Sequence, residues 1–305
     1  MKKIILSLFS FSVILSANAQ DVPEKKAQAG IVLGAGMNFQ KLGTKYLESA
    51  GMGGNFTIGA NANIRLADNI ALCTGLEFDF SRWKYNTTND TYYRYDDTKI
   101  IQYSESNNAV FYNTNEDDVV AANSYEASLF NSPVPIDTTE SIYKLKDRKH
   151  KVIYATIPLM FTFRTDYYGN LRYFGKFGLR TGFTISSKID DSGSTLSEDA
   201  SGVWREKSEE NTNMKAKNEV FFVKSAIGIA AGAEWKFSGS TSLLFEAGFY
   251  YGFTPLHVTL KPEEPENNHL YVNRDLNKNS TYETNEYFAA KSGQTQLLFK
   301  VGILF

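Results

Sequence analysis

The sequence predicts an all-β protein, an eight-stranded antiparallel up-and-down transmembrane β-barrel with long extracellular loops. Three observations lead to this prediction. Apolar residues recur at every second position in eight segments, these segments are ten to eighteen residues long, and short and long connections alternate between them. Successive side chains of a strand point to opposite faces, and about 9–11 residues of tilted strand cross a bilayer. A soluble sandwich needs only about five or six residues per strand.

Each predicted strand has one apolar face and one face of polar, charged and glycine residues. In chain order the strands are residues 30–39, 55–66, 70–83, 151–164, 171–186, 220–237, 241–254 and 294–305. Their apolar faces begin at Ile31, Phe56, Ile70, Ile153, Leu171, Phe221, Leu243 and Leu297. Alternation continues to the terminal Phe305, although chain ends usually fray into water. We therefore expect the last strand to close the barrel at the membrane interface.

The connections between these segments differ in length in a regular way. Short turns are predicted at residues 67–69, 165–170 and 238–240, and longer excursions at 40–54, 84–150, 188–219 and 255–293. This alternation is typical of an outer-membrane barrel, which has tight periplasmic turns and long external loops. Closure of an even number of strands would pair every backbone donor, as lipid requires.

The N-terminal residues predict export from the cytoplasm. Lys2 and Lys3 precede an apolar run at residues 4–15, which is too short to span a bilayer comfortably, and an A-x-A motif follows at 17–19. This pattern predicts a cleaved signal peptide over residues 1–19. An uncleaved membrane anchor, the alternative, would need around 20 apolar residues.

Residues 20–305 are then expected to form a single outer-membrane β-barrel domain in the bacterial outer membrane. The only cysteine, Cys73, allows no intramolecular disulfide. The formal net charge of -2 is too small to indicate nucleic acid as a partner. Outer membrane lipid is the partner that the apolar strand faces predict.

The polar faces predict a network of charges inside the barrel. An eight-stranded barrel is only wide enough to be filled by side chains or to hold one small ligand. We expect a salt-bridged plug, and a polar conduit or ligand pocket is the alternative. The predicted network comprises Arg65, Glu77, Asp79, Arg172, Lys176, Arg180, Glu234, Glu246 and Lys300.

The sequence gives only weak signals for catalytic or metal-binding residues, and we expect no catalytic, cofactor or metal site. Glu77 and Asp79 share one face, which would suit acid–base catalysis but suits inward arginines equally well. The three histidines, His150, His257 and His269, lie in or beside predicted loops without metal-ligand spacing. The segment NEDD at residues 115–118 and the acidic pair at 263–264 could hold calcium weakly, although solvated loop acids are the simpler interpretation. The protein is therefore not expected to be an enzyme.

The loop at residues 84–150 contains several short tyrosine-rich pieces, such as residues 92–95 and 109–112. It could form strand-like extensions above the membrane, a disordered loop, or two further membrane strands that would make ten. Tyrosine offers a large contact area at modest entropic cost, so the external loops are candidates for a binding surface.

The chain resembles the PorT-like outer-membrane β-barrel family. The likeness rests on the predicted signal peptide, the opening strand GIVLGAGMNF, the segment YATIPLMFTFR at residues 154–164 and the aromatic C-terminus at Phe305. Pro158 would remove a ladder hydrogen bond, so we expect a local bulge there. The resemblance implies that Phe305 is part of a signal read by the barrel-assembly machinery.

Members of the PorT-like family are similar in fold, while their activities differ. The resemblance suggests envelope or secretion-system proteins as possible partners. We therefore expect a scaffold or interaction protein of the cell envelope. The alternative is a small-solute transporter or channel.

Overall fold

The computed structural model describes residues 26–95, 101–102, 111–113, 118–120, 141–198, 204–215, 220–257, 270–272, 286–288 and 292–305. The predicted signal peptide at residues 1–19 lies outside them. No helix in the described part of the chain is long and apolar enough to cross a membrane.

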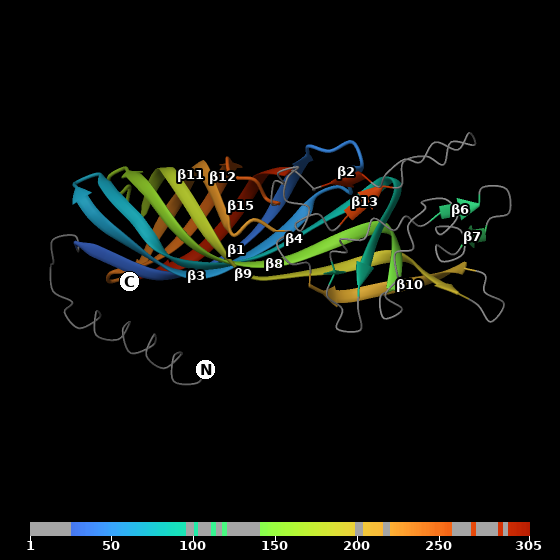
Figure 1. Cartoon of the computed structure of the whole chain (residues 1–305). Coiled ribbons are helices and arrows are strands. Elements are labelled where there is room, and N and C mark those ends of the chain that lie inside the picture. Colours follow the sequence, from blue (N-terminus) through green and yellow to red (C-terminus); the bar gives the residue numbers. More distant parts are fainter. Residues whose placement is uncertain are drawn as a thin grey trace.

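Eight long strands form a closed antiparallel ring in which each strand pairs with its neighbours along the chain (Figure 1). The first strand of the ring pairs with the last, in register from Gly30 opposite Leu304 to Leu42 opposite Ser292. The predicted eight-stranded barrel and its closing strand are thus confirmed. The ring strands are β1 (Ala27–Leu42), β3 (Gly53–Ala67), β4 (Ile70–Tyr95), β8 (Ser141–Arg164), β9 (Leu171–Glu198), β11 (Val223–Ser238), β12 (Thr241–Gly252) and β15 (Ser292–Leu304).

The apolar faces of the strands point away from the barrel axis. Leu33, Phe177 and Phe299 are 43%, 50% and 51% exposed, although each belongs to a regular strand. Residues on the opposite faces, such as Thr57 and Glu77, are fully buried. An apolar exterior around a polar interior is the reverse of a soluble protein, and it suits strands that are surrounded by lipid.

Tight turns close one end of the barrel, and the C-terminus lies at this same end (Figure 1). The turns after β8 and β11 contain Gly169 and Gly239, whose φ angles are 65° and 53°. Glycine adopts this left-handed conformation without the steric cost that a side chain would bring. By the usual arrangement of such barrels this is the periplasmic end.

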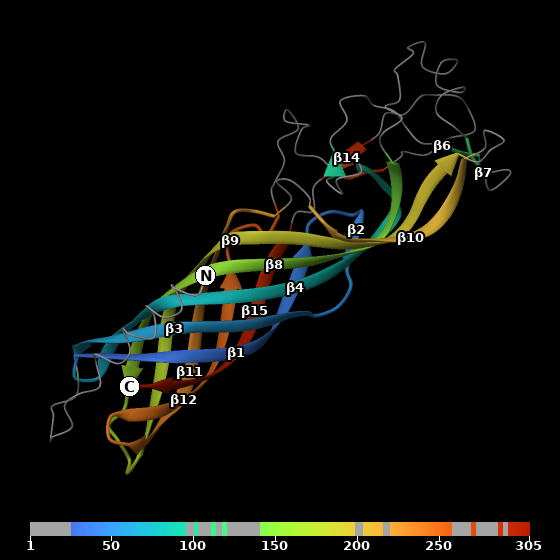
Figure 2. The ribbon, with the colours of Figure 1, turned by 90° about the horizontal axis from the view of Figure 1, so that it is seen from below.

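At the other end, β4, β8 and β9 continue past the barrel (Figure 2). They contain 26, 24 and 28 residues, so each exceeds the length that crosses a bilayer. We call the part of these strands beyond the barrel, together with β2 and β10, the external extension. The shorter strands of the chain are β2 (Leu47–Ser49), β5 (Ile101–Gln102), β6 (Phe111–Asn113), β7 (Asp118–Val120), β10 (Trp204–Met214), β13 (Leu270–Val272) and β14 (Glu286–Phe288).

This extension corrects the predicted boundaries of two loops. Residues 84–95 and 141–150 are strand rather than loop, and so are 188–198 and 204–214. Of the three possibilities for residues 84–150, strand-like extensions are the one found in their described part. The ends were misplaced because the apolar residues change faces where the strands leave the barrel.

The change of face is clearest along β4. Phe80 points outward and is 40% exposed, as expected for a lipid-facing residue. Beyond it the outward positions become basic, at Arg82 and Lys84, and the inward positions become aromatic, at Trp83 and Tyr85. Both aromatic residues are buried, at 2% and 0% exposure. We call this reversal the polarity inversion, and it marks the passage from lipid to water.

The predicted bulge at Pro158 is wrong. Pro158 pairs in register with Arg180 on β9, and the nearest register shift between β8 and β9 lies between Ile153 and Tyr154. On the β4 side the same register holds before and after the proline, although the pairing is interrupted beside it. The proline therefore interrupts the hydrogen bonds to β4 locally, but no extra residue is inserted into the strand. The register shift of β8 lies between Ile153 and Tyr154, close to the polarity inversion.

Candidate functional site

The interior of the barrel holds a cluster of charged side chains from four strands. Glu77 and Asp79 come from β4, Arg180 from β9, Glu246 from β12 and Lys300 from β15. None of the five is more than 6% exposed. They meet because every second residue of a barrel strand points inward.

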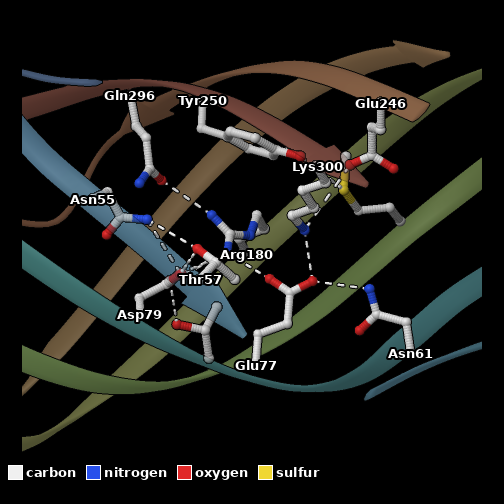
Figure 3. Close-up of polar contacts among 12 residues, drawn as sticks. Asn55, Thr57, Asn61, Glu77, Asp79, Arg180, Glu246, Tyr250, Gln296 and Lys300 are labelled. Atoms are coloured by element: carbon white, nitrogen blue, oxygen red, sulfur yellow. Dashed lines mark hydrogen bonds and ion pairs between the residues drawn. The ribbon is translucent and has the colours of Figure 1, made fainter. Parts of the chain in front are cut away.

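These charges form ion pairs across the barrel (Figure 3). Arg180 Nη2 lies 2.5 Å from Glu77 Oε2 and 3.1 Å from Asp79 Oδ2. Lys300 Nζ lies 2.5 Å from Glu77 Oε1 and 3.9 Å from a carboxylate oxygen of Glu246. The same Glu246 accepts a hydrogen bond of 2.6 Å from Lys176 Nζ. We call these six residues, with their alternating signs, the central ion network.

Neutral side chains occupy further sites on the two carboxylates of β4. Thr57 and Thr156 donate hydrogen bonds of 2.5 Å and 2.7 Å to Asp79, and Asn61 donates one of 2.9 Å to Glu77. A buried charge is tolerated only where it is paired and its remaining lone pairs are satisfied. Both carboxylates are therefore held as partners of inward cations.

Three of the predicted network residues lie outside the central ion network. Arg172 Nε donates a hydrogen bond of 2.6 Å to Glu234, which also lies 3.4 Å from Arg164 Nη2. Arg65 is at the barrel rim, where its Nη2 lies 2.7 Å from the exposed Asp68 of the following turn. The structure thus separates the predicted set into a central network, a pair nearer the turns and a rim pair.

An aromatic cluster at the mouth of the barrel was not predicted from the sequence. Trp83 stacks on His150, with ring centroids 4.9 Å apart, and the rings of His150 and His257 are 5.0 Å apart. His257 Nδ1 lies 2.6 Å from Ser292 Oγ. The sequence predicts both histidines in or beside loops; His150 instead lies within β8, whereas His257 lies outside the named strands, and both are at most 1% exposed. Apolar and aromatic residues on the inward face beyond residue 81 were the signal for this cluster.

The remaining metal candidates lie largely outside the described residues. His269, residues 115–117 and residues 263–264 belong to this undescribed part. Among the residues that are described, no group of three His, Cys, Asp or Glu side chains could hold a metal ion.

The external extension has a hydrophobic core of its own. Arg148 and Asp191 form an ion pair inside the extension, with Arg148 Nε 2.8 Å from Asp191 Oδ1 and both side chains inaccessible to solvent. A second hydrogen bond of 2.8 Å joins Arg148 Nη2 to Asp191 Oδ2, so the pair is bidentate. The hydrophobic core and this ion pair together make the extension a structured element rather than a flexible loop. The residues of the hydrophobic core are Tyr46, Leu47, Tyr85, Tyr143, Leu145, Ile189 and Met214.

The C-terminal residue completes the closing strand. The backbone N–H of Phe305 donates a hydrogen bond of 2.7 Å to Ala29 O, and the side chain is 38% exposed. The ring therefore lies on the outer surface at the periplasmic rim.

Phe305→Ser is expected to lower the amount of folded barrel in the outer membrane several-fold, because it removes the aromatic ring and leaves the backbone hydrogen bond possible. Phe305→Tyr, which keeps an aromatic ring, should assemble normally. The folded fraction is measured by heat-modifiable gel mobility of outer-membrane fractions. Equal assembly of the serine and tyrosine variants would contradict a role of the ring as an assembly signal.

An apolar exterior, a closed ring of eight strands and an ion-paired interior together define an outer-membrane β-barrel protein. A family profile for the outer membrane protein beta-barrel domain matches residues 18–258, and the chain belongs to this family. The protein is accordingly located in the bacterial outer membrane. No curated protein matches the chain.

Several solved structures of outer-membrane barrels are similar to the chain. Ail of Yersinia pestis, solved in complex with the heparin analogue sucrose octasulfate, is 9% identical, with a TM-score of 0.30, over 92% of this chain and 100% of that one. The outer membrane protease OmpT of Escherichia coli is 11% identical, with a TM-score of 0.30, over 95% and 99%. A major outer membrane protein of Thermus thermophilus is 12% identical, with a TM-score of 0.32, over 92% and 99%.

Proposed function

We propose that this protein is a non-catalytic scaffold or interaction protein of the cell envelope, and that its external extension is the binding surface. The observation that carries this proposal is the hydrophobic core of the extension with its buried Arg148–Asp191 pair. A preorganised surface binds a partner at a lower entropic cost than a flexible loop does.

The barrel interior supports a scaffold more than a small-solute channel. Side chains from β4, β9, β12 and β15 meet in the central ion network, and Glu77 is bonded to both Arg180 and Lys300 at 2.5 Å. Passage of a solute would require breaking buried ion pairs, which is costly. The same arrangement leaves neither Glu77 nor Asp79 without a cation.

The proposed partner is an envelope or secretion-system protein, as the PorT-like resemblance suggests. The extension rises beyond the barrel mouth on β4, β8, β9 and β10, so its contacts would be made outside the membrane (Figure 2). Exposed residues on β10, such as Lys207 and Glu210, are accessible to such a partner.

Site-specific photocrosslinking in intact cells tests this function. A photoreactive residue at Lys207 or Glu210 is expected to crosslink to one and the same envelope protein, whereas the same residue at Asp68 or Ser240 in the periplasmic turns should not. These crosslinks should disappear in an Arg148→Ala variant, in which the extension is expected to unfold. Recovery of only a lone monomer from all four positions would contradict the proposal.

A further inference from the structure

Five basic side chains gather on the outward surface where the barrel meets the external extension. They belong to three adjacent strands, β4, β8 and β9. In the strand register Arg82 is opposite Lys151, Lys151 is opposite Lys188, and Lys84 is opposite Lys149. We call these five residues the basic patch. Like charges directly opposite each other destabilise a sheet, so this arrangement needs a compensating anion.

The protein itself neutralises the patch only in part. Lys84 Nζ lies 3.0 Å from Asp147, and Lys151 forms an ion pair with Asp190. Arg82 and Lys188 have no ion-pair partner among the described residues. Five bases minus these two acids leave three positive charges. The exposed Glu210, which lines the depression beside the patch, reduces this excess to two.

The ionisation of Asp190 is consistent with a positive surface. Its partial burial alone would raise the pKa of this carboxyl. The hydrogen bonds from Lys151 and from the backbone N–H of Asn213, together with the charge of Lys149, outweigh this effect and hold the pKa of Asp190 below its ordinary value. Asp190 therefore remains charged near neutral pH and keeps its ion pair with Lys151.

The position of the patch relative to the membrane indicates the class of ligand that it would meet. Just below it the outward residues are apolar, at Phe80, Ile153 and Ile185, and the polarity inversion begins at Arg82. The patch therefore lies at the level of the lipid head groups of the outer leaflet. The open depression beside it, of about 500 Å³, is lined by three bases of the patch and by four acidic residues. The phosphate contacts are therefore expected on the outward strand surface and not inside this depression.

We propose that the basic patch binds the phosphate groups of a phosphorylated glycolipid of the outer leaflet, whose acyl chains lie along the apolar strand faces below. Arginine and lysine bind phosphate through short, charge-assisted hydrogen bonds. A lipid fits better than a soluble anion because the charged surface and the apolar surface are continuous on the same three strands. The bound phosphates supply the anion that the opposed like charges require.

Native mass spectrometry of the detergent-purified full-length protein tests this site, with bisphosphorylated lipid A as the probe. The variant Arg82→Gln/Lys149→Gln/Lys188→Gln removes three bases of the patch. Because each base near an anionic lipid surface contributes roughly a fivefold factor, removal of three bases is expected to lower the retention of lipid A on the order of 100-fold.

The matched control is Lys41→Gln/Lys146→Gln/Lys236→Gln, which removes three exposed lysines outside the patch. It should retain lipid A within about twofold of the unmodified protein. Dephosphorylated lipid A should bind the unmodified protein as weakly as the patch variant binds the intact lipid. Equal weakening by both triple variants would overturn the proposal, as would equal retention of phosphatidylglycerol by the unmodified protein. Heat-modifiable mobility of each variant shows that its barrel is folded.

Discussion

Arg180→Met is expected to lower the free energy of unfolding of the barrel by about 3–5 kcal/mol, the typical cost of removing one partner from a buried ion pair. Arg180 is the ion-pair partner of Asp79 and one of two cations on Glu77. Without it, two carboxylates from one strand remain close together in the interior. The effect is measured as a shift of the urea unfolding curve of the protein reconstituted in lipid.

Arg65→Met is the matched control because its partner Asp68 is on the surface, with 96% of its side chain exposed. An exposed ion pair contributes about 0–1 kcal/mol, so this variant should unfold almost like the unmodified protein. Adding Asp79→Asn to Arg180→Met should recover part of the loss, because it removes one of the orphaned charges. An Arg180→Met variant as stable as Arg65→Met would show that the central ion network does not hold the barrel together.

Arg148→Ala is expected to unfold the external extension while the barrel remains intact. Arg148 and Asp191 are both inaccessible to solvent, and the substitution leaves the Asp191 carboxylate buried without its bidentate partner. The local cost is again about 3–5 kcal/mol. Limited proteolysis should then cleave within the extension at least tenfold faster, with unchanged heat-modifiable mobility of the barrel.

The double variant Arg148→Met/Asp191→Leu tests whether the charge, rather than the packing, causes this effect. Replacing both members of a buried ion pair by apolar residues is often neutral or stabilising. Protease resistance should therefore return. Simultaneous loss of barrel mobility in Arg148→Ala would show instead that the barrel and the extension unfold as one unit.

The barrel could be predicted from the sequence because lipid imposes a simple rule. Every second residue of a membrane strand must be apolar, and this alternation identified all eight ring strands and the pairing of the first with the last. The inward acidic and basic residues followed from the same periodicity. Their grouping did not, because which strands face each other across the interior depends on the geometry of the closed ring.

The extension was missed because water imposes the opposite rule. Beyond Phe80 the apolar side chains Trp83 and Tyr85 turn inward, so the alternation continues with its faces exchanged. A search for one apolar face therefore ends at the membrane surface. In addition, residues 86–91 are all polar, a composition that is typical of a loop. His150 was misplaced for the same reason, since it belongs to the inward face beyond the polarity inversion.

The exchange of faces has a consequence for biogenesis. The extension is wider than a single hairpin and has a water-facing exterior, whereas the barrel interior beneath it is crossed by ion pairs such as Arg180 with Glu77. A folded extension could not pass through that interior. We therefore expect the strands of the extension to cross the bilayer unfolded, before the ion pairs of the barrel interior form.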